Sequence, residues 1–328
     1  MTRDDGHDVD EPVHDGDSRG DAARGDGGAA VEPPEADVEP AGSDGDASPG
    51  PGPDADPGEA SDVAADSPRL SISDIALSYG DGDPVVEADR LEVPAGEITA
   101  LIGPNGSGKS TLLKSMNAEL APDRGAVTFD GRDVEEYGTT ELARRLGLLS
   151  QEHVAPDSTT VRELATHGRY PHRGFFEGMR EEDYRAVDRA IERVGVEHLA
   201  DRPVGDLSGG QGQLAWLAMV LAQETDALLL DEPTTFLDLH HQLRVLDAVR
   251  ELNEDHGVTV CVVLHDIGQA ARFADNLIAL KDGEPYEWGP PDEVINEQLL
   301  RDVFGVEAEV GFGPDGPRVI PRRAIDEE

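Results

Sequence analysis

The stretch Gly103-Pro-Asn-Gly-Ser-Gly-Lys-Ser110 decides which fold this chain can adopt. It matches the pattern G-x-x-x-x-G-K-[ST], whose glycines let backbone N–H groups turn inward around phosphate oxygens. Lys109 adds a positive charge near the β- and γ-phosphates, and Ser110 offers its hydroxyl to Mg²⁺. An apolar strand pattern, Glu97–Ile102, precedes the loop and a helix follows it, as phosphate binding requires. We therefore predict a nucleotide site formed by Gly103, Pro104, Asn105, Gly106, Ser107, Gly108, Lys109, Ser110 and the next residue, Thr111.

A second stretch, Ala227-Leu-Leu-Leu-Asp231-Glu232-Pro233, places two carboxylates at the end of an apolar strand. A strand end beside the phosphate loop lets Asp231 hold Mg²⁺, directly or through water. Glu232 is one residue further and points in another direction, so it can polarise the water that attacks the terminal phosphate. An acidic turn after a strand is the plainer alternative, and the phosphate loop upstream argues against it.

From residue 67 onward the chain alternates strand and helix patterns, which indicates a βαβ architecture. Helical patterns occupy most of residues 155–205 and interrupt the alternation. A long helix from about Leu239 to Asp255 is expected to stop at Gly257. Further strands are predicted at 70–79, 126–129, 146–149, 258–264 and 276–280.

Residues 1–66 differ from the rest: they carry 20 acidic and three basic side chains and almost no Leu, Ile or aromatic residue. Such a segment buries too little apolar area to offset its ordering entropy, so we expect a disordered tail, followed by one folded domain at 67–328. The segment also lacks the basic start and apolar run of a secretory signal.

The folded part keeps about −26 of the total charge of −43, with lysine only at Lys109, Lys114 and Lys281. This balance argues against a general nucleic-acid binder, which needs a basic footprint. An acidic surface with few lysines suggests a cytoplasm of high salt, where screening weakens self-repulsion. An ordinary acidic protein with an acidic interaction tail is the alternative.

The single cysteine, Cys261, lies in the apolar run Val258–Leu264, so we expect a core residue and a reducing compartment. No apolar run approaches the ~18 residues that a membrane-spanning helix needs. Any work at a membrane is therefore expected to use a partner chain.

A third motif, Leu207-Ser208-Gly209-Gly210-Gln211, opens a helix rich in Ala, Leu and Met. A serine hydroxyl and glycine N–H groups at a helix N-terminus form an anion site. Together with the other two motifs, it makes the chain resemble the ATPases of ABC transporters, in which this pentapeptide is the signature. The resemblance implies that Ser208, Gly209, Gly210 and Gln211 cap the γ-phosphate of ATP bound to a second copy, so that a homodimer encloses two ATP molecules.

Smaller elements of that family also occur in order. Tyr79 stands where the family has an aromatic that stacks on adenine, although a surface tyrosine is the alternative. Gln151 matches the Q-loop, which contacts Mg²⁺ and water. Asp238 matches the D-loop, which bridges the two subunits, and His265 matches the switch histidine at the γ-phosphate. His167, His172, His240 and His241 have no such support.

The resemblance spans residues 68–323 and implies an α/β P-loop NTPase domain. Its parts would be a mostly parallel core sheet, an antiparallel β subdomain and a helical subdomain at about 152–205. Within the family, the chain is most similar to ATPases that power importers of ferric siderophores, haem and cobalamin, with the siderophore branch nearest. The stretches that carry this similarity are Gly168–His172, Ala215–Thr225, Leu230–Asp238, Val263–Ile267 and Val303–Gly305.

Such an ATPase would use ATP and Mg²⁺ and act at the cytoplasmic face of the membrane, with permease subunits and, indirectly, a solute-binding protein. The rival is a soluble ABC ATPase of DNA repair, chromosome organisation or translation, but these usually add a coiled coil, zinc modules or a second motor. One departure from the family concerns Gly212 and Leu214, which stand where basic residues usually follow the signature. Their effect is open at this point.

Overall fold

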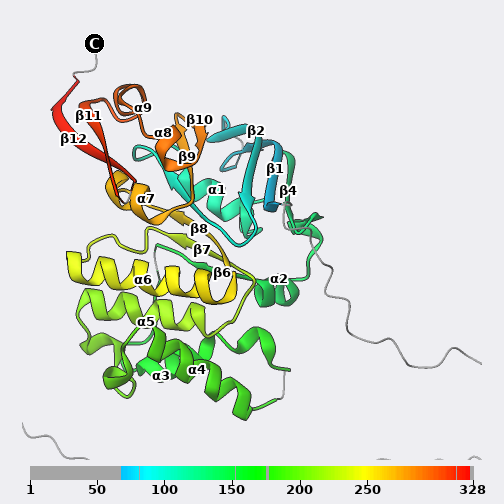
Figure 1. Cartoon of the computed structure of the whole chain (residues 1–328). Helices are drawn as coiled ribbons and strands as arrows, with labels where there is room; N and C mark the ends of the chain where they lie inside the picture. Colours follow the sequence, from blue (N-terminus) through cyan, green and yellow to red (C-terminus); the bar gives the residue numbers. More distant parts are fainter. Residues whose placement is uncertain (1–67, 81, 152, 175–176, 315, 326–328) are drawn as a thin grey trace, which may run out of the picture. The chain divides into compact units, whose positions relative to one another are not determined.

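The computed structural model describes residues 68–80, 82–151, 153–174, 177–314 and 316–325. The tail predicted at 1–66 lies outside the described residues. At the centre is a six-stranded sheet in the order β10-β9-β3-β8-β7-β6 (Figure 1). Its strands are β3 (Ile98–Ile102), β6 (Leu146–Leu149), β7 (Ala227–Asp231), β8 (Thr259–Val263), β9 (Asn276–Lys281) and β10 (Glu284–Gly289).

Five of these strands run parallel, and β10 adds an antiparallel edge. Every residue of β3, β7 and β8 is buried, because helices or the second sheet cover both faces. This burial explains why these strands appear in the sequence as continuous apolar runs rather than as alternating patterns. The mostly parallel core sheet predicted from the sequence is confirmed.

A second sheet is antiparallel, with the order β2-β1-β4-β5. Its strands are β1 (Pro68–Leu77), β2 (Val86–Pro94), β4 (Arg124–Phe129) and β5 (Arg132–Asp133). Alternate residues of β2 are buried, so one face packs inward. That face shares a core with α1 (Lys109–Met116), through Leu112, Leu113 and Met116. The predicted antiparallel subdomain is therefore present.

Within residues 152–205, the predicted helices appear as α3 (Val161–His167), the short η2 (Tyr170–His172) and α4 (Glu181–Arg193). Thr160 caps α3, because its hydroxyl oxygen accepts a hydrogen bond from the backbone N–H of Glu163. These helices pack on α5 (Gly209–Leu221), which in turn packs on α6 (Leu239–His256). Gly257 ends α6 in the left-handed conformation, as predicted. In Figure 1, α6, α5 and the α3–α4 pair form successive layers beside the central sheet.

Several elements had no clear sequence pattern. They include α2 (Thr139–Arg145), the helix α7 (Ile267–Phe273) that follows β8, and a C-terminal hairpin of β11 (Val306–Gly313) and β12 (Gly316–Ala324) that packs on α7. The remaining short elements are η1 (Val134–Glu136), η3 (Glu197–Leu199), η4 (Val204–Asp206), α8 (Pro291–Val294) and α9 (Glu297–Asp302).

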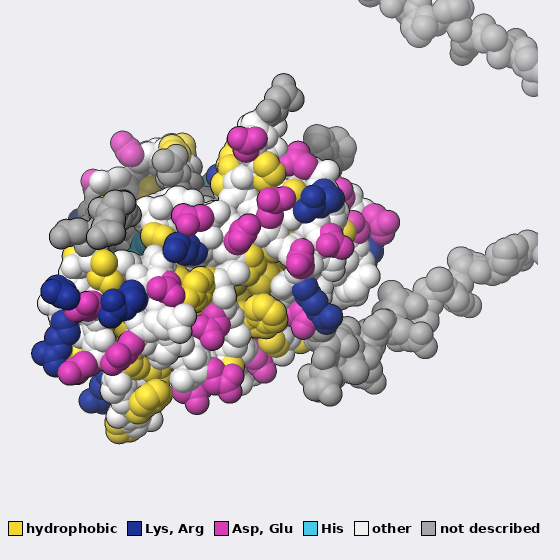
Figure 2. Space-filling model, turned by 90° about the horizontal axis from the view of Figure 1, so that it is seen from above, with side chains coloured by type: hydrophobic (Ala, Val, Ile, Leu, Met, Phe, Trp, Pro, Cys, Tyr) yellow, Lys and Arg dark blue, Asp and Glu magenta, His cyan; other side chains and the backbone are white. Residues whose placement is uncertain are grey.

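Cys261 lies in β8 and is 1% exposed, and burial raises the pKa of its thiol to about 12. The predicted core position is confirmed. Among the described residues, no helix is both long enough and apolar enough to cross a membrane. Figure 2 shows acidic side chains spread over one face of the molecule, with fewer Lys and Arg side chains between them.

Candidate functional site

A cleft of about 750 Å³ opens where β3, β7 and β8 end, the edge at which ligands bind in open α/β sheets. The phosphate loop follows β3, Glu232 follows β7, and His265 follows β8. Residues predicted from three separate motifs therefore meet in one place. The cleft is lined by Val85, Asn105, Gly106, Gly108, Lys109, Ser110, Thr111, Gln151, Glu232, Thr235, Phe236 and His265.

Two glycines of the phosphate loop, Gly103 and Gly108, lie too close to neighbouring atoms to be replaced by any larger residue. A Cβ on Gly103 would lie 2.3 Å from the carbonyl oxygen of Leu280, and one on Gly108 would lie 2.4 Å from the side chain of Val86. Gly108 also has a φ of 93° at the start of α1. The loop thereby holds the N–H groups at the start of α1 toward the cleft, where they can meet phosphate oxygens.

Lys109 is 5% exposed, and its ammonium donates to the carbonyl oxygens of Gly103 (3.0 Å) and Pro104 (2.8 Å). Burial lowers the pKa of Lys109, while the charges of Glu232 and Asp231 act in the opposite direction. Within the loop, the ammonium is solvated by main-chain carbonyls rather than paired with a carboxylate, so its positive charge remains available to an anion.

Asp231 lies beside Ser110, which lines the cleft. The Ser110 hydroxyl donates to Asp231 Oδ1 over 2.9 Å, and Asp231 is 5% exposed. Burial raises the pKa of this carboxyl above its ordinary value; the Ser110 hydrogen bond opposes the rise and the charge of Glu232 adds to it. A buried carboxylate beside a hydroxyl is a donor set that suits a hard divalent cation such as Mg²⁺.

Two predicted catalytic residues, Gln151 and His265, contact the carboxylate of a third, Glu232. Its Oε1 lies 2.5 Å from His265 Nε2, and its Oε2 accepts from Gln151 Nε2 over 2.8 Å. Thr235, which the sequence did not single out, also donates to Oε2 over 3.1 Å. Glu232 has a φ of 52°, a rare conformation for a residue other than glycine. The backbone at Glu232 is therefore held in a conformation that costs free energy.

Tyr79 lies beside the first turns of α1. Its hydroxyl is 3.3 Å from Thr111 Oγ1, and the ammonium of Lys114 is 6.0 Å from its ring centre. The ring is 55% exposed, so its face is available for stacking on a planar group. Phe236, 98% exposed, lines the cleft, whereas Tyr79 does not. The sequence analysis did not single out Phe236.

The signature residues lie elsewhere. Ser208 caps α5, with its Oγ accepting from Gln211 N over 3.4 Å, and Asp238 caps α6, with its Oδ1 accepting from His241 N over 3.0 Å. None of Ser208, Gly209, Gly210, Gln211 or Asp238 lines the described cleft. The phosphate loop and the signature thus lie at separate places on the described chain.

His241, which had no predicted role, joins the signature to Asp238. Its Nδ1 donates to Asp238 Oδ1 over 2.9 Å, and a Cβ on Gly210 would come within 2.4 Å of its ring. The departures after the signature differ from each other. Leu214 is 4% exposed and packs in the core, whereas a Cβ on Gly212 would meet nothing within 4 Å. Position 214 thus supplies packing here, not charge.

The chain is similar to known proteins over most of its folded part. A family model described as ABC transporter matches residues 86–235. The ferric enterobactin transport ATP-binding protein FepC of Escherichia coli is 45% identical over 77% of this chain and 94% of its own length. The iron(3+)-hydroxamate import ATP-binding protein FhuC of Bacillus subtilis is 43% identical over 75% and 91%.

A cobalamin import ATP-binding protein, BtuD of Halobacterium salinarum, is 37% identical over 71% of this chain and 58% of its own length. Among solved structures, a metal-chelate type ABC transporter in an inward-facing conformation has a TM-score of 0.68 and 25% identity, covering 78% of this chain and 98% of that chain. With the cleft, the phosphate loop and the signature helix in place, this chain belongs to the family of ABC transporter ATP-binding proteins.

Proposed function

We propose that this chain hydrolyses ATP to power the uptake of a ferric siderophore through a separate permease. ATP binding and ATPase activity belong to the family. The observation that carries the catalytic assignment is the convergence of Gln151 and His265 on the two oxygens of Glu232, beside the phosphate loop.

In this proposal, Lys109 and the loop N–H groups hold the phosphates of ATP in the cleft. Water attacks the terminal phosphorus, the bond to the ADP oxygen breaks, and the Glu232 carboxylate takes the proton of the water. His265 and Gln151 keep that carboxylate aimed at the cleft. Ser110 and Asp231, with Gln151 at the edge, would hold Mg²⁺, which neutralises phosphate charge when it is bound.

Two copies of the chain are proposed to enclose two ATP molecules. The separation of Ser208 and Asp238 from the chain's own cleft supports this arrangement, since both then face a nucleotide held by the partner. ATP binding would close the dimer and hydrolysis would reopen it.

The permease is proposed to dock at the cytoplasmic side, close to Gln151 and the segment Gly168–His172. Exposed apolar side chains support this location: Val154 is 93% exposed and Tyr170 is 56% exposed. A solute-binding protein would act on the far side of the membrane and meet this chain only through the permease.

The cargo assignment rests on the relatives, since a motor evolves with its permease. FepC and FhuC both exceed the cobalamin relative in identity and coverage. Cobalamin or haem import is the alternative cargo. A soluble ABC ATPase of DNA repair or translation is less well supported, because the acidic surface disfavours nucleic acid.

Deleting the gene tests the cargo. We expect growth under iron limitation with a ferric siderophore to fail, excess free iron to restore it, and cobalamin supply to have no effect. Normal siderophore uptake with lost cobalamin uptake would reassign the cargo and leave the ATPase assignment in place.

A further inference from the structure

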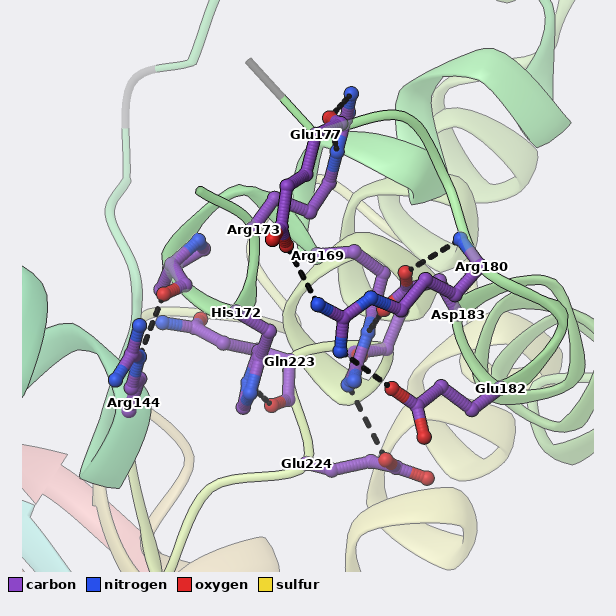
Figure 3. Close-up of polar contacts among 12 residues, drawn as sticks. Arg144, Arg169, His172, Arg173, Glu177, Arg180, Glu182, Asp183, Gln223 and Glu224 are labelled. Carbon is purple, nitrogen blue, oxygen red and sulfur yellow. Dashed lines mark hydrogen bonds and ion pairs between the residues drawn. The ribbon is translucent and has the colours of Figure 1, made fainter. Parts of the chain in front are cut away.

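The segment after α3 has residues that face inward on both sides of an exposed turn. Arg169 is 6% exposed and His172 is partly buried, whereas Tyr170 between them is 56% exposed. The Tyr170 ring stacks on His167 at 5.0 Å between ring centres, so the exposed turn has a defined shape. Figure 3 shows the inward residues and their polar contacts.

Arg169, which follows α3, links the start of α4 to the end of α5 through one guanidinium (Figure 3). It donates to Asp183 at the start of α4 over 2.9 Å, and to the carbonyl oxygen of Ala222 and the carboxylate of Glu224, after α5, over 2.8 Å and 3.1 Å. Burial acts to raise the pKa of Asp183, but hydrogen bonds from Arg180 N and Arg169 outweigh it and leave that pKa below its ordinary value. The buried charges are thus paired in a fixed geometry.

His172 makes a second connection to the same helix end. Its Nε2 donates to the carbonyl oxygen of Gln223 over 2.7 Å, and the Gln223 side-chain amide donates to the carbonyl oxygen of Ala143 in α2. Arg144, also in α2, donates from Nε to the carbonyl oxygen of Pro171 over 2.6 Å. The exposed turn is therefore attached both to the end of α5 and to a helix beside the core sheet.

Both connections use main-chain carbonyls of the two residues that directly follow α5, Ala222 and Gln223, so they hold the backbone at the end of the helix rather than a side chain. With its 13 residues, α5 spans about 20 Å. Its buried residues, including Leu217 and Ala218, pack it as one piece. At the N-terminal end of α5, Ser208 and Gly209 belong to the signature.

We propose that Arg169 and His172 are positioning residues that carry a displacement of the exposed turn Tyr170–Pro171 along α5 to Ser208. The inference rests on the proposed function, because the permease is the partner that would displace the turn. Arg169 fixes the angle between α4 and α5, and His172 fixes the turn to the end of α5. A shift of the turn then moves both ends of the signature helix together.

The first test uses hydrogen exchange in the isolated full-length chain. We expect His172→Ala to speed exchange of the Gln223 and Glu224 amides at least fivefold, with little effect on the amides of the central sheet. His172→Gln, which restores a donor to Gln223 O, should recover most of the protection. Arg173→Ala is the matched control: Arg173 lies over the Tyr170 ring and donates to the carbonyl oxygen of Glu177, so the variant disturbs the turn but leaves both connections to the end of α5 in place. Unchanged exchange in His172→Ala would overturn the proposal.

The second test measures ATPase activity with and without the cognate permease. We expect His172→Ala and Arg169→Lys to keep the basal kcat and the KM for ATP within twofold, and to lose at least fivefold of the stimulation by the permease. Arg189→Ala removes the other partner of Glu224 but keeps both connections to α5, so it should keep the stimulation.

The two tests separate transmission from stability and from cargo. If basal activity and stimulated activity fall by the same factor and the melting temperature falls as well, Arg169 and His172 only stabilise the fold. The proposal is then wrong. Exchange in the isolated chain does not depend on which compound the permease carries, so a wrong cargo assignment leaves the first test valid.

Discussion

His265 Nε2 lies 2.5 Å from Glu232 Oε1, although these residues follow different strands of the central sheet. Gln151, from a third loop, donates to the other carboxylate oxygen. Both oxygens of Glu232 thus have a polar partner, and these contacts orient the carboxylate. Such preorganisation is what a general base needs, because its geometry then costs nothing at the moment of reaction.

Replacing Glu232 by Gln should leave ATP binding in place and slow hydrolysis by about 100-fold or more, the usual contribution of a general base. The amide keeps the size of the side chain and can still accept one hydrogen bond, so the fold should persist. Single-turnover hydrolysis of labelled ATP measures the effect. Turnover within a few-fold of the unchanged protein would show that another group activates the water.

Replacing Lys109 by Ala should weaken ATP binding severely, because it removes the positive charge held inside the phosphate loop. Titration calorimetry with ATP measures the loss. Lys114→Ala is the matched control, since Lys114 lies in the same helix but outside the cleft lining. Equal affinities in both variants would contradict the role given to Lys109.

Replacing Asp231 by Asn should stabilise the nucleotide-free protein while abolishing activity. The raised pKa of Asp231 means that ionising this carboxyl is less favourable in the folded state than in the unfolded state. The amide removes that penalty and can still accept from Ser110, so we expect a higher Tm than in the unchanged protein when thermal unfolding is measured at neutral pH.

The sign of this effect with pH follows from linkage. Above the folded-state pKa the ionised carboxylate opposes folding, and as pH falls toward the ordinary value of 3.8 the carboxyl becomes protonated. The stability gain of Asp231→Asn should therefore shrink as the solution is acidified. A gain that grows on acidification would mean that Asp231 is stabilised as an anion.

ATP should assemble two copies of the Glu232→Gln protein, and ADP should not. The reason is that Ser208 lies away from the chain's own cleft and needs a partner's γ-phosphate. Chromatography with light scattering measures the mass. Ser208→Arg in the same background is expected to abolish the dimer. A monomer with ATP at high protein concentration would count against the enclosed-nucleotide arrangement.

Salt should stabilise the folded part, which carries about −26 of net charge on a surface where acids predominate (Figure 2). Screening weakens this self-repulsion, so Tm and ATPase activity should rise from dilute buffer toward molar KCl. The same rise in a chain lacking residues 1–66 would place the effect in the folded part. Maximal stability in dilute buffer would refute the adaptation to high salt.

The nucleotide site was predictable because its parts have strict local requirements. A phosphate loop needs glycines, a lysine and a hydroxyl at fixed spacing, and the strands before Gly103, Glu232 and His265 are continuous apolar runs. The sequence does not show how far apart the motifs lie in space. The hydrogen bonds from Gln151 and Thr235 to Glu232 are therefore visible only in the folded structure.

The C-terminal hairpin of β11 and β12 was missed for a different reason. Val310 and Val319 are only partly buried, and neighbouring Phe312 and Ile320 are exposed, so β11 and β12 lack a clean alternating pattern. His241 was set aside because an isolated histidine is uninformative. Its contact with Asp238 is local to the start of α6, whereas its closeness to Gly210 depends on how α6 packs against α5.

The buried thiol of Cys261 has a practical consequence for experiments. The chain contains one cysteine, and burial with a pKa of about 12 keeps its thiolate scarce and shielded at neutral pH. A cysteine introduced at an exposed position would then be the one that reacts with maleimide dyes or spin labels. Distances between two such probes can be followed through the ATPase cycle in the otherwise unaltered sequence.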